Sequence, residues 1–170
     1  HRVLERSNRN KPTEDKSNSL SIFLEGDGKP WIEEKHIAKD PSGNFLLALA
    51  LMENYNDQSL YIGRPCYHEV NDPKCHYRYW TSHRYSHEVL ASITNLIKTE
   101  IISSNPSSLI LIGHSGGGAI ASLIACQFDR PTYLVTIDAN LDTKAWTTHH
   151  NWSPLNDSLN PALDSTLCPQ

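Results

Sequence analysis

The stretch that decides the fold is GHSGGG, residues 113–118, which stands between the apolar runs LILI, residues 109–112, and AIASLIA, residues 119–125. The pattern G-x-S-x-G is typical of a nucleophile elbow, a sharp turn from strand into helix that presents a serine hydroxyl above the sheet. A backbone this tight tolerates little except glycine beside the serine. The continuous apolar run before the motif and the small-residue run after it match a buried parallel strand and a closely packed helix. We therefore predict that Ser115 is a catalytic nucleophile; the alternative is a glycine-rich turn without chemistry.

Segments of strand and helix character alternate on either side of this motif. Strands are predicted at residues 20–24, 59–63, 109–112 and 133–137, and helices at residues 44–54, 85–102 and directly after Ser115. Such alternation predicts an α/β fold with a mostly parallel sheet and flanking helices. Residues 5–19 are polar and are expected to form a connecting loop. We expect residues 1–170 to form one domain.

The composition of the chain bears on whether it binds nucleic acid or crosses a membrane. The chain has 170 residues, 38% of them hydrophobic, with 15 Lys and Arg against 19 Asp and Glu. Without a basic stripe, nucleic acid is not an expected partner. The longest apolar run, residues 45–52, is far shorter than the roughly 20 residues of a membrane-spanning helix, so no transmembrane segment is expected.

A second glycine-flanked turn, EGDG at residues 25–28, follows the first predicted strand. In open α/β sheets the carboxyl ends of strands carry the binding sites. An activated serine needs two backbone donors for the oxyanion of the reacting carbonyl. We predict that these are the amides of Gly116, the residue after the nucleophile, and of Asp27. The alternative for residues 25–28 is a plain tight turn.

The acid and the base of a serine triad are expected after the nucleophile, in that order. Asp138 and Asp142 follow the last predicted strand, and Asp142 is the favoured acid, although a turn or helix-cap role is the commoner one. The histidines after the serine are His149 and His150. No further strand is visible after residue 137, so we expect the gene product to continue beyond Gln170. The alternative is a minimal triad built from these residues.

The four cysteines differ in their surroundings. Cys66 and Cys75 bracket a polar loop with an Asp-Pro turn, and we favour a disulfide between them over two free thiols or a zinc site completed by His68 and His76. A disulfide would indicate an oxidising compartment. Cys126 is expected to be a small buried core residue, and Cys168 has no obvious partner.

Several of these segments together resemble the α/β-hydrolase superfamily, and more narrowly a group of exported or lipoprotein-like bacterial α/β-hydrolases. The matching segments are EGDG at 25–28, GRPC at 63–66 with the later Cys75, YWT at 79–81 with RYS at 84–86, GHSGG at 113–117, and NLD at 140–142 with SLNP at 158–161. The resemblance covers most of residues 20–140. It implies a serine hydrolase fold, a Cys66–Cys75 disulfide, an extracytoplasmic location, and an acid and a histidine on strands beyond Gln170.

The leading hypothesis is a serine hydrolase that cleaves an ester, thioester or similar acyl bond of a small-molecule substrate through an acyl-serine intermediate, with no metal and no organic cofactor. Aromatic side chains at Tyr77, Tyr79, Trp80 and Tyr85 either line its pocket or belong to ordinary packing. The alternative is a hydrolase-fold binding or scaffold protein without catalysis. A metal-binding protein is a weaker third reading, because the nine histidines have no metal-site spacing.

Overall fold

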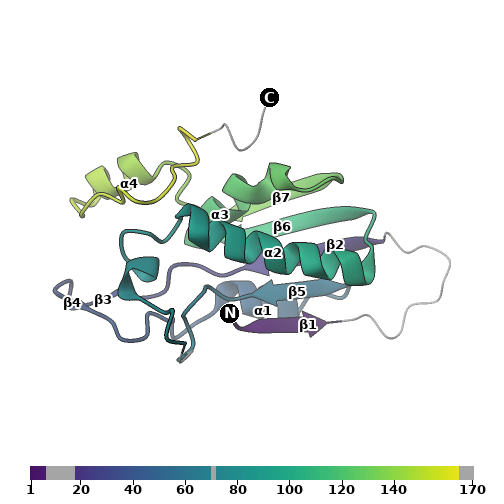
Figure 1. The fold of residues 1–170 in the computed structure, drawn as a ribbon, viewed down its shortest axis with the longest axis horizontal. Helices are drawn as coiled ribbons and strands as arrows, with labels where there is room; N and C mark the ends of the chain where they lie inside the picture. Colours follow the sequence, from purple (N-terminus) through teal and green to yellow (C-terminus); the bar gives the residue numbers. More distant parts are fainter. Residues whose placement is uncertain (7–17, 70–71, 165–170) are drawn as a thin grey trace.

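A computed structural model describes residues 1–6, 18–69 and 72–164. Its main sheet has five strands in the order β1-β5-β2-β6-β7, and only β1 is antiparallel to its neighbour (Figure 1). The strands are β1 (Val3–Arg6), β2 (Ser19–Leu24), β5 (Ser59–Ile62), β6 (Ser108–His114) and β7 (Thr132–Ile137). The predicted α/β class with a mostly parallel sheet is therefore confirmed.

Helices cover both faces of the sheet. One face packs against α2 (His87–Ser104) and α3 (Gly116–Ile124), and the other against α1 (Leu47–Glu53) (Figure 1). The side chains of β2 alternate between these two cores, with Ile22 in the first and Phe23 in the second. Burial on both faces explains why the central strands read as continuous apolar runs.

The smaller elements are a hairpin of β3 (Trp31–Ile32) and β4 (His36–Ile37), the 3₁₀ helices η1 (Tyr77–Trp80) and η2 (Ala125–Gln127), and α4 (Thr143–His149). The hairpin, η1 and α4 gather at one end of the molecule (Figure 1). This is the end toward which the parallel strands run, because β2 leads into the loop before β3 and β7 leads into the segment before α4. The fold thus places its irregular segments where α/β proteins form sites.

The two helices predicted before Ser115 begin and end at residues slightly different from those predicted. The helix expected at residues 85–102 begins at His87, because the side chain of Ser86 accepts a hydrogen bond from the amide of Val89 and so caps it. It ends at Ser104, because Asn105 takes a left-handed conformation with φ of 43°. The helix expected at residues 44–54 is shorter, Leu47–Glu53.

The expectation of a loop over residues 5–19 was wrong at both ends. Glu5 and Arg6 belong to β1, and Ser19 opens β2, while residues 7–17 lie outside the described part of the chain. The strand β1 was missed because it is an edge strand whose residues are mostly exposed, so its sequence carries no apolar alternation. After β7 the described residues, which run to 164, form no further strand.

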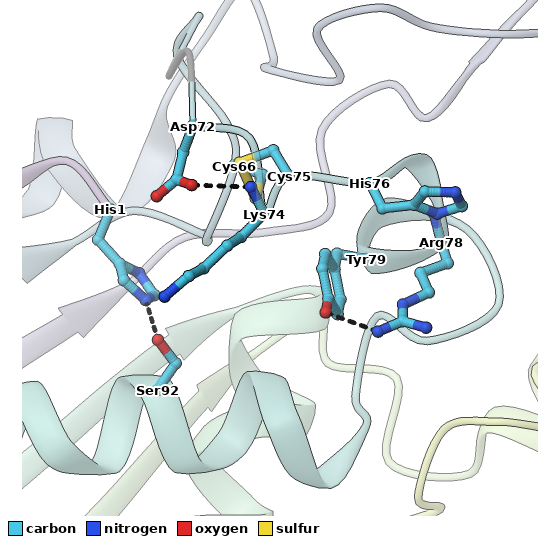
Figure 2. Close-up of a disulfide and its surroundings, with 9 residues drawn as sticks. All are labelled: His1, Cys66, Asp72, Lys74, Cys75, His76, Arg78, Tyr79 and Ser92. Atoms are coloured by element: carbon cyan, nitrogen blue, oxygen red, sulfur yellow. Dashed lines mark hydrogen bonds between the residues drawn. A yellow bond between two sulfur atoms is a disulfide. The ribbon is translucent and has the colours of Figure 1, made fainter.

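A disulfide joins Cys66 to Cys75, with a Cα–Cα distance of 5.4 Å, and closes the loop between β5 and η1 (Figure 2). Close by, the His1 imidazole is hydrogen-bonded to the Ser92 hydroxyl of α2 over 2.7 Å, which ties the first residue to this corner (Figure 2). The pairing favoured from the sequence is therefore present in the structure.

The expectation for Cys126 was wrong. Its residue is exposed in η2 rather than buried in the core, and its sulfur is disulfide-bonded. The α-helix after Ser115 ends at Ile124, and in the 3₁₀ turn that follows, Ala125 still packs against the core whereas Cys126 is exposed. Cys168 lies outside the described residues.

Residues 1–6, 18–69 and 72–164 lack two kinds of feature. None of their helices combines the length and the apolar composition that a membrane span requires. Nor do they contain a group of three or more His, Cys, Asp and Glu side chains arranged to hold a metal ion.

Candidate active site

Ser115 occupies the turn between β6 and α3 in a conformation that few residues other than glycine adopt. Its φ is 50° and its ψ is −121°, and its amide donates to the carbonyl of Ile137 at the end of β7 over 2.9 Å. Such backbone strain in a non-glycine residue is found mainly at functional sites, where the surrounding structure holds it. This geometry is that of a nucleophile elbow.

The neighbouring glycines are required because other parts of the backbone come too close to leave room for a side chain. A Cβ atom on Gly113 would lie 2.4 Å from the carbonyl oxygen of Gly117, and a Cβ atom on Gly117 would lie 2.2 Å from that of Leu24. A Cβ atom essentially never lies within 3.0 Å of a non-bonded heavy atom, so any larger residue would push α3 away from β2 and β6. The run of glycines is therefore explained by the close packing of the start of α3 against the sheet.

Ser115 opens onto a cleft of about 1000 Å³. Apart from His114 and Ser115, it is lined by residues 25–31, 43–46, 67–68 and 151–155, and by Glu34, Ile37, Tyr77, Thr81, Ser82, Arg84, Trp146 and Thr147. These segments belong to the hairpin, η1 and α4 end of the molecule (Figure 1). The volume lies at the upper end of the range for small-molecule sites.

The turn at residues 25–28 lies directly beside the serine. The strands β2 and β6 pair in parallel with Leu24 opposite Gly113, so both chains leave the sheet at the same level. A Cβ atom on Gly26 would lie 3.3 Å from the Cβ of Ser115, and one on Gly116 would lie 2.2 Å from Asp27 Oδ1. The structure therefore brings together Ser115, Gly116 and Asp27, the three residues that the sequence proposed for nucleophile and oxyanion donors.

Asp27 is buried, and four side chains bond it, three through its carboxylate and one through its main-chain carbonyl. Arg64 donates to its Oδ1 over 2.5 Å, Arg84 donates to its Oδ2 over 3.2 Å, and the Tyr85 hydroxyl also donates to Oδ2. The hydroxyl of Tyr67 donates to the main-chain carbonyl of Asp27 over 2.9 Å. These bonds fix both the side chain and the backbone of the residue next to Ser115.

Burial by itself would raise the pKa of Asp27, because a low-dielectric environment disfavours the charged carboxylate. The positive charges of Arg84 and Arg64 and the hydrogen bond from Tyr85 outweigh burial and hold the pKa below its ordinary value. Asp27 is therefore ionised at neutral pH. Its single negative charge offsets part of the cost of burying the two guanidinium groups of Arg64 and Arg84.

A second buried acid lies on the other side of the turn. Glu25 Oε1 accepts from the amide of Gly26 over 3.1 Å, and Oε2 accepts from the amide of Leu49 over 3.4 Å. The imidazole Nδ1 of His114 lies 3.6 Å from Glu25 Oε1 and has no hydrogen-bond partner in the described structure. Both residues line the cleft, and the sequence offered no signal for either beyond their place next to the two turns.

The predicted acids and histidines lie elsewhere. Asp138 follows β7 and is exposed, and Asp142 is the N-cap of α4, where its carboxylate accepts from the amides of Lys144 and Ala145. His149 and His150 are exposed at the end of α4. The residues that line the cleft include none of these four, so the structure does not bring them to Ser115.

Hydrogen bonds join Asp142 to residues 158–161, so that two of the segments on which the family resemblance rests, 140–142 and 158–161, are in contact. Asn160 donates to its Oδ1 over 3.0 Å and accepts from the amide of Thr143 over 3.1 Å, while Asn140 donates to the Tyr85 hydroxyl over 3.1 Å. Because Tyr85 also contacts Asp27, hydrogen bonds link Asn140 through Tyr85 to the turn at residues 25–28.

The predicted aromatic wall is present only in part. Tyr77 lines the cleft. Trp80 and Tyr85 are buried, and Tyr79 packs against the main core, so these three serve packing. The sequence missed the roles of Arg64, Arg84 and Tyr67, because an arginine that pairs with a distant buried acid looks like any surface charge until the fold is known.

Comparisons with known proteins add little detail. No protein-family model matches the chain, and no curated protein matches it in sequence. Three solved chains match in structure. One comes from work on carboxylesterases of the ammonia-oxidizing thaumarchaeon Nitrososphaera gargenis, with a TM-score of 0.45 and 16% sequence identity. The match covers 88% of this chain and 46% of that one, so this chain spans less than half of that protein's length.

Proposed function

We propose that this chain carries the nucleophile and the oxyanion site of a serine hydrolase that cleaves ester, thioester or similar acyl bonds. The observation that carries the proposal is the strained conformation of Ser115 at a strand-to-helix turn that opens onto a cleft. A serine held in this way supplies its hydroxyl to a bound carbonyl. As the Ser115 oxygen forms a bond to the carbonyl carbon, a base would take the hydroxyl proton and pass it to the departing alcohol or thiol. Water would then hydrolyse the acyl-serine, which releases the acid and restores the hydroxyl.

Charge on the tetrahedral intermediate would be stabilised by two backbone amides. Gly116 is the first residue of α3, and amides in the first turn of a helix have no intrahelical acceptor and lie at the positive end of the helix dipole. The second amide is that of Asp27, whose side chain and carbonyl are anchored by Arg64, Arg84 and Tyr67. This anchoring supports a donor whose position does not change during the reaction.

Asp142 remains the proposed acid of the triad, and the base is proposed to be a histidine beyond Gln170, as the resemblance implies. The capping bonds of Asp142 favour a structural role instead. A hydrolase-fold binding protein is the second candidate, because neither His149 nor His150 lines the cleft. An extracytoplasmic location is also proposed, and the Cys66–Cys75 disulfide is compatible with it.

The test is labelling of the full-length protein with a fluorophosphonate probe, in which the serine oxygen attacks phosphorus and fluoride leaves. We expect a mass increase of one probe per chain, lost in Ser115→Ala. Ser153→Ala is the matched control, because Ser153 lines the same cleft and should label like the parent protein. If the full-length protein takes up no probe, or if Ser115→Ala still labels, the hydrolase proposal fails and the binding protein is favoured.

A further inference from the structure

The cleft that contains Ser115 has an apolar outer part built from three separate segments. Trp31 and Ile37 come from the β3–β4 hairpin, Phe45 precedes α1, and Trp152 follows α4. All four are exposed despite their size, with Phe45 at 73%, Trp152 at 48%, Trp31 at 43% and Ile37 at 39%. Large apolar side chains from different elements that converge on one opening indicate a ligand or lipid site.

The aromatic wall is continuous with the floor of the cleft. The guanidinium of Arg84 lies 6.0 Å from the ring centre of Trp146, and Trp146 contacts Trp152 edge to face at 5.0 Å. The ring of Trp152 in turn stacks on His150 at 4.6 Å. A ligand that entered beside Trp152 would therefore follow aromatic surface inward to the residues around Ser115.

The two carboxylates of the cleft floor already have hydrogen-bond partners within the protein. Asp27 is paired with Arg84 and Arg64, and Glu25 accepts two backbone amides. An uncharged ligand would leave all of these bonds in place. The floor is thus compatible with an ester carbonyl group, and the exposed apolar side chains of the outer part suit a hydrocarbon chain.

We infer that the substrate is an ester or thioester with a long hydrocarbon acyl chain, which lies along Trp146, Trp152, Trp31 and Phe45. This inference rests on the proposed function for the position of the reacting carbonyl. It goes beyond that function in naming the part of the substrate that supplies the binding energy.

The first experiment measures binding separately from catalysis. Octanoate, decanoate and laurate share a head group and differ only in chain length, and each is titrated into the full-length protein while tryptophan fluorescence is followed. Burial of a methylene stabilises a complex by about 0.8 kcal/mol, which is about fourfold in affinity. We expect the dissociation constant to fall at least tenfold from octanoate to laurate. An affinity that does not change with chain length would overturn the inference.

The second experiment uses variants and two esters. Phe45→Ser is expected to weaken laurate binding at least fivefold and to lower the ratio of kcat/KM for p-nitrophenyl laurate to that for p-nitrophenyl acetate by a similar factor. Ile102→Ser is the matched control, because Ile102 is an 83% exposed apolar residue on α2 that does not line the cleft. Equal effects of the two substitutions would also overturn the inference.

The two proposals fail in different ways. Chain-length-dependent binding without fluorophosphonate labelling of Ser115 would refute the proposed function and support the chain-binding cleft. Labelling of Ser115 together with equal affinity for octanoate and laurate would support the hydrolase and refute the acyl-chain site.

Discussion

Gly117 is the residue at which the first turn of α3 lies against β2. An added Cβ atom would lie 2.2 Å from the Leu24 carbonyl oxygen, which is backbone and cannot rotate away. We expect Gly117→Ala to lower the free energy of unfolding by about 1–3 kcal/mol, the usual cost of overpacking. Urea denaturation measures this change. Gly43→Ala is the control, because its nearest contact would be 3.4 Å, an ordinary distance, and it should change stability by less than about 1 kcal/mol.

Asp27 is the second residue whose substitution is informative. Asp27→Asn would leave the buried charges of Arg64 and Arg84 uncompensated, and we expect a loss of about 3–5 kcal/mol of stability at pH 7. Because the folded pKa of Asp27 is lowered, its stabilisation is present above about pH 4, the ordinary aspartate value, and is lost as the pH falls through the folded pKa.

The difference between the parent protein and Asp27→Asn should therefore shrink when urea denaturation is repeated at pH 3. Asp142→Asn is the control for a carboxylate on the surface, since asparagine caps a helix about as well as aspartate does. A constant difference at both pH values would show that the ion pairs do not stabilise the fold.

At the scale of elements, Asp142 at the start of α4 has two possible roles, helix cap and acid of the triad, and these can be tested separately. As a cap it accepts from the amides of Lys144 and Ala145, a function that asparagine retains and alanine does not. We expect Asp142→Ala to lower stability by about 1 kcal/mol and Asp142→Asn to leave it nearly unchanged. If Asp142 is the acid of the triad, Asp142→Asn must also reduce fluorophosphonate labelling by orders of magnitude at unchanged stability. Labelling rates of the two variants decide between the roles.

Elements that the sequence predicted well are those whose signal is local. The strands β2, β5 and β6 are buried or half-buried apolar runs, and β7 is an apolar run although three of its residues are exposed. The contact of Gly113 with Gly117 and Gly118 lies within six residues of chain. The strand β1 was missed because an edge strand covers little of the core and needs no apolar pattern. The helix α4 was missed because its seven residues are mostly exposed and polar.

At the scale of the whole molecule, the Cys66–Cys75 disulfide joins residues nine positions apart. Loop closure of this length restricts the unfolded chain by about 2–3 kcal/mol. We expect the double substitution Cys66→Ser and Cys75→Ser to lower the free energy of unfolding by this amount in urea denaturation. Tyr67 lies inside the closed loop and bonds the carbonyl of Asp27, so the same variant should also slow labelling of Ser115. Unchanged labelling would show that the loop does not affect the reactivity of Ser115.

The sequence by itself determined the α/β class, the elbow serine and the pairing of the two nearby cysteines. Each of these is recorded within a short stretch of chain, because glycine at a close contact, an apolar run in a buried strand and two cysteines across a turn are local requirements. The tertiary structure alone decided the anchoring of Asp27, since its partners Arg64 and Arg84 lie 37 and 57 positions away. It also decided the shape of the cleft, whose aromatic wall is assembled from segments that meet only when the strands align in parallel and their carboxyl ends reach one edge of the sheet.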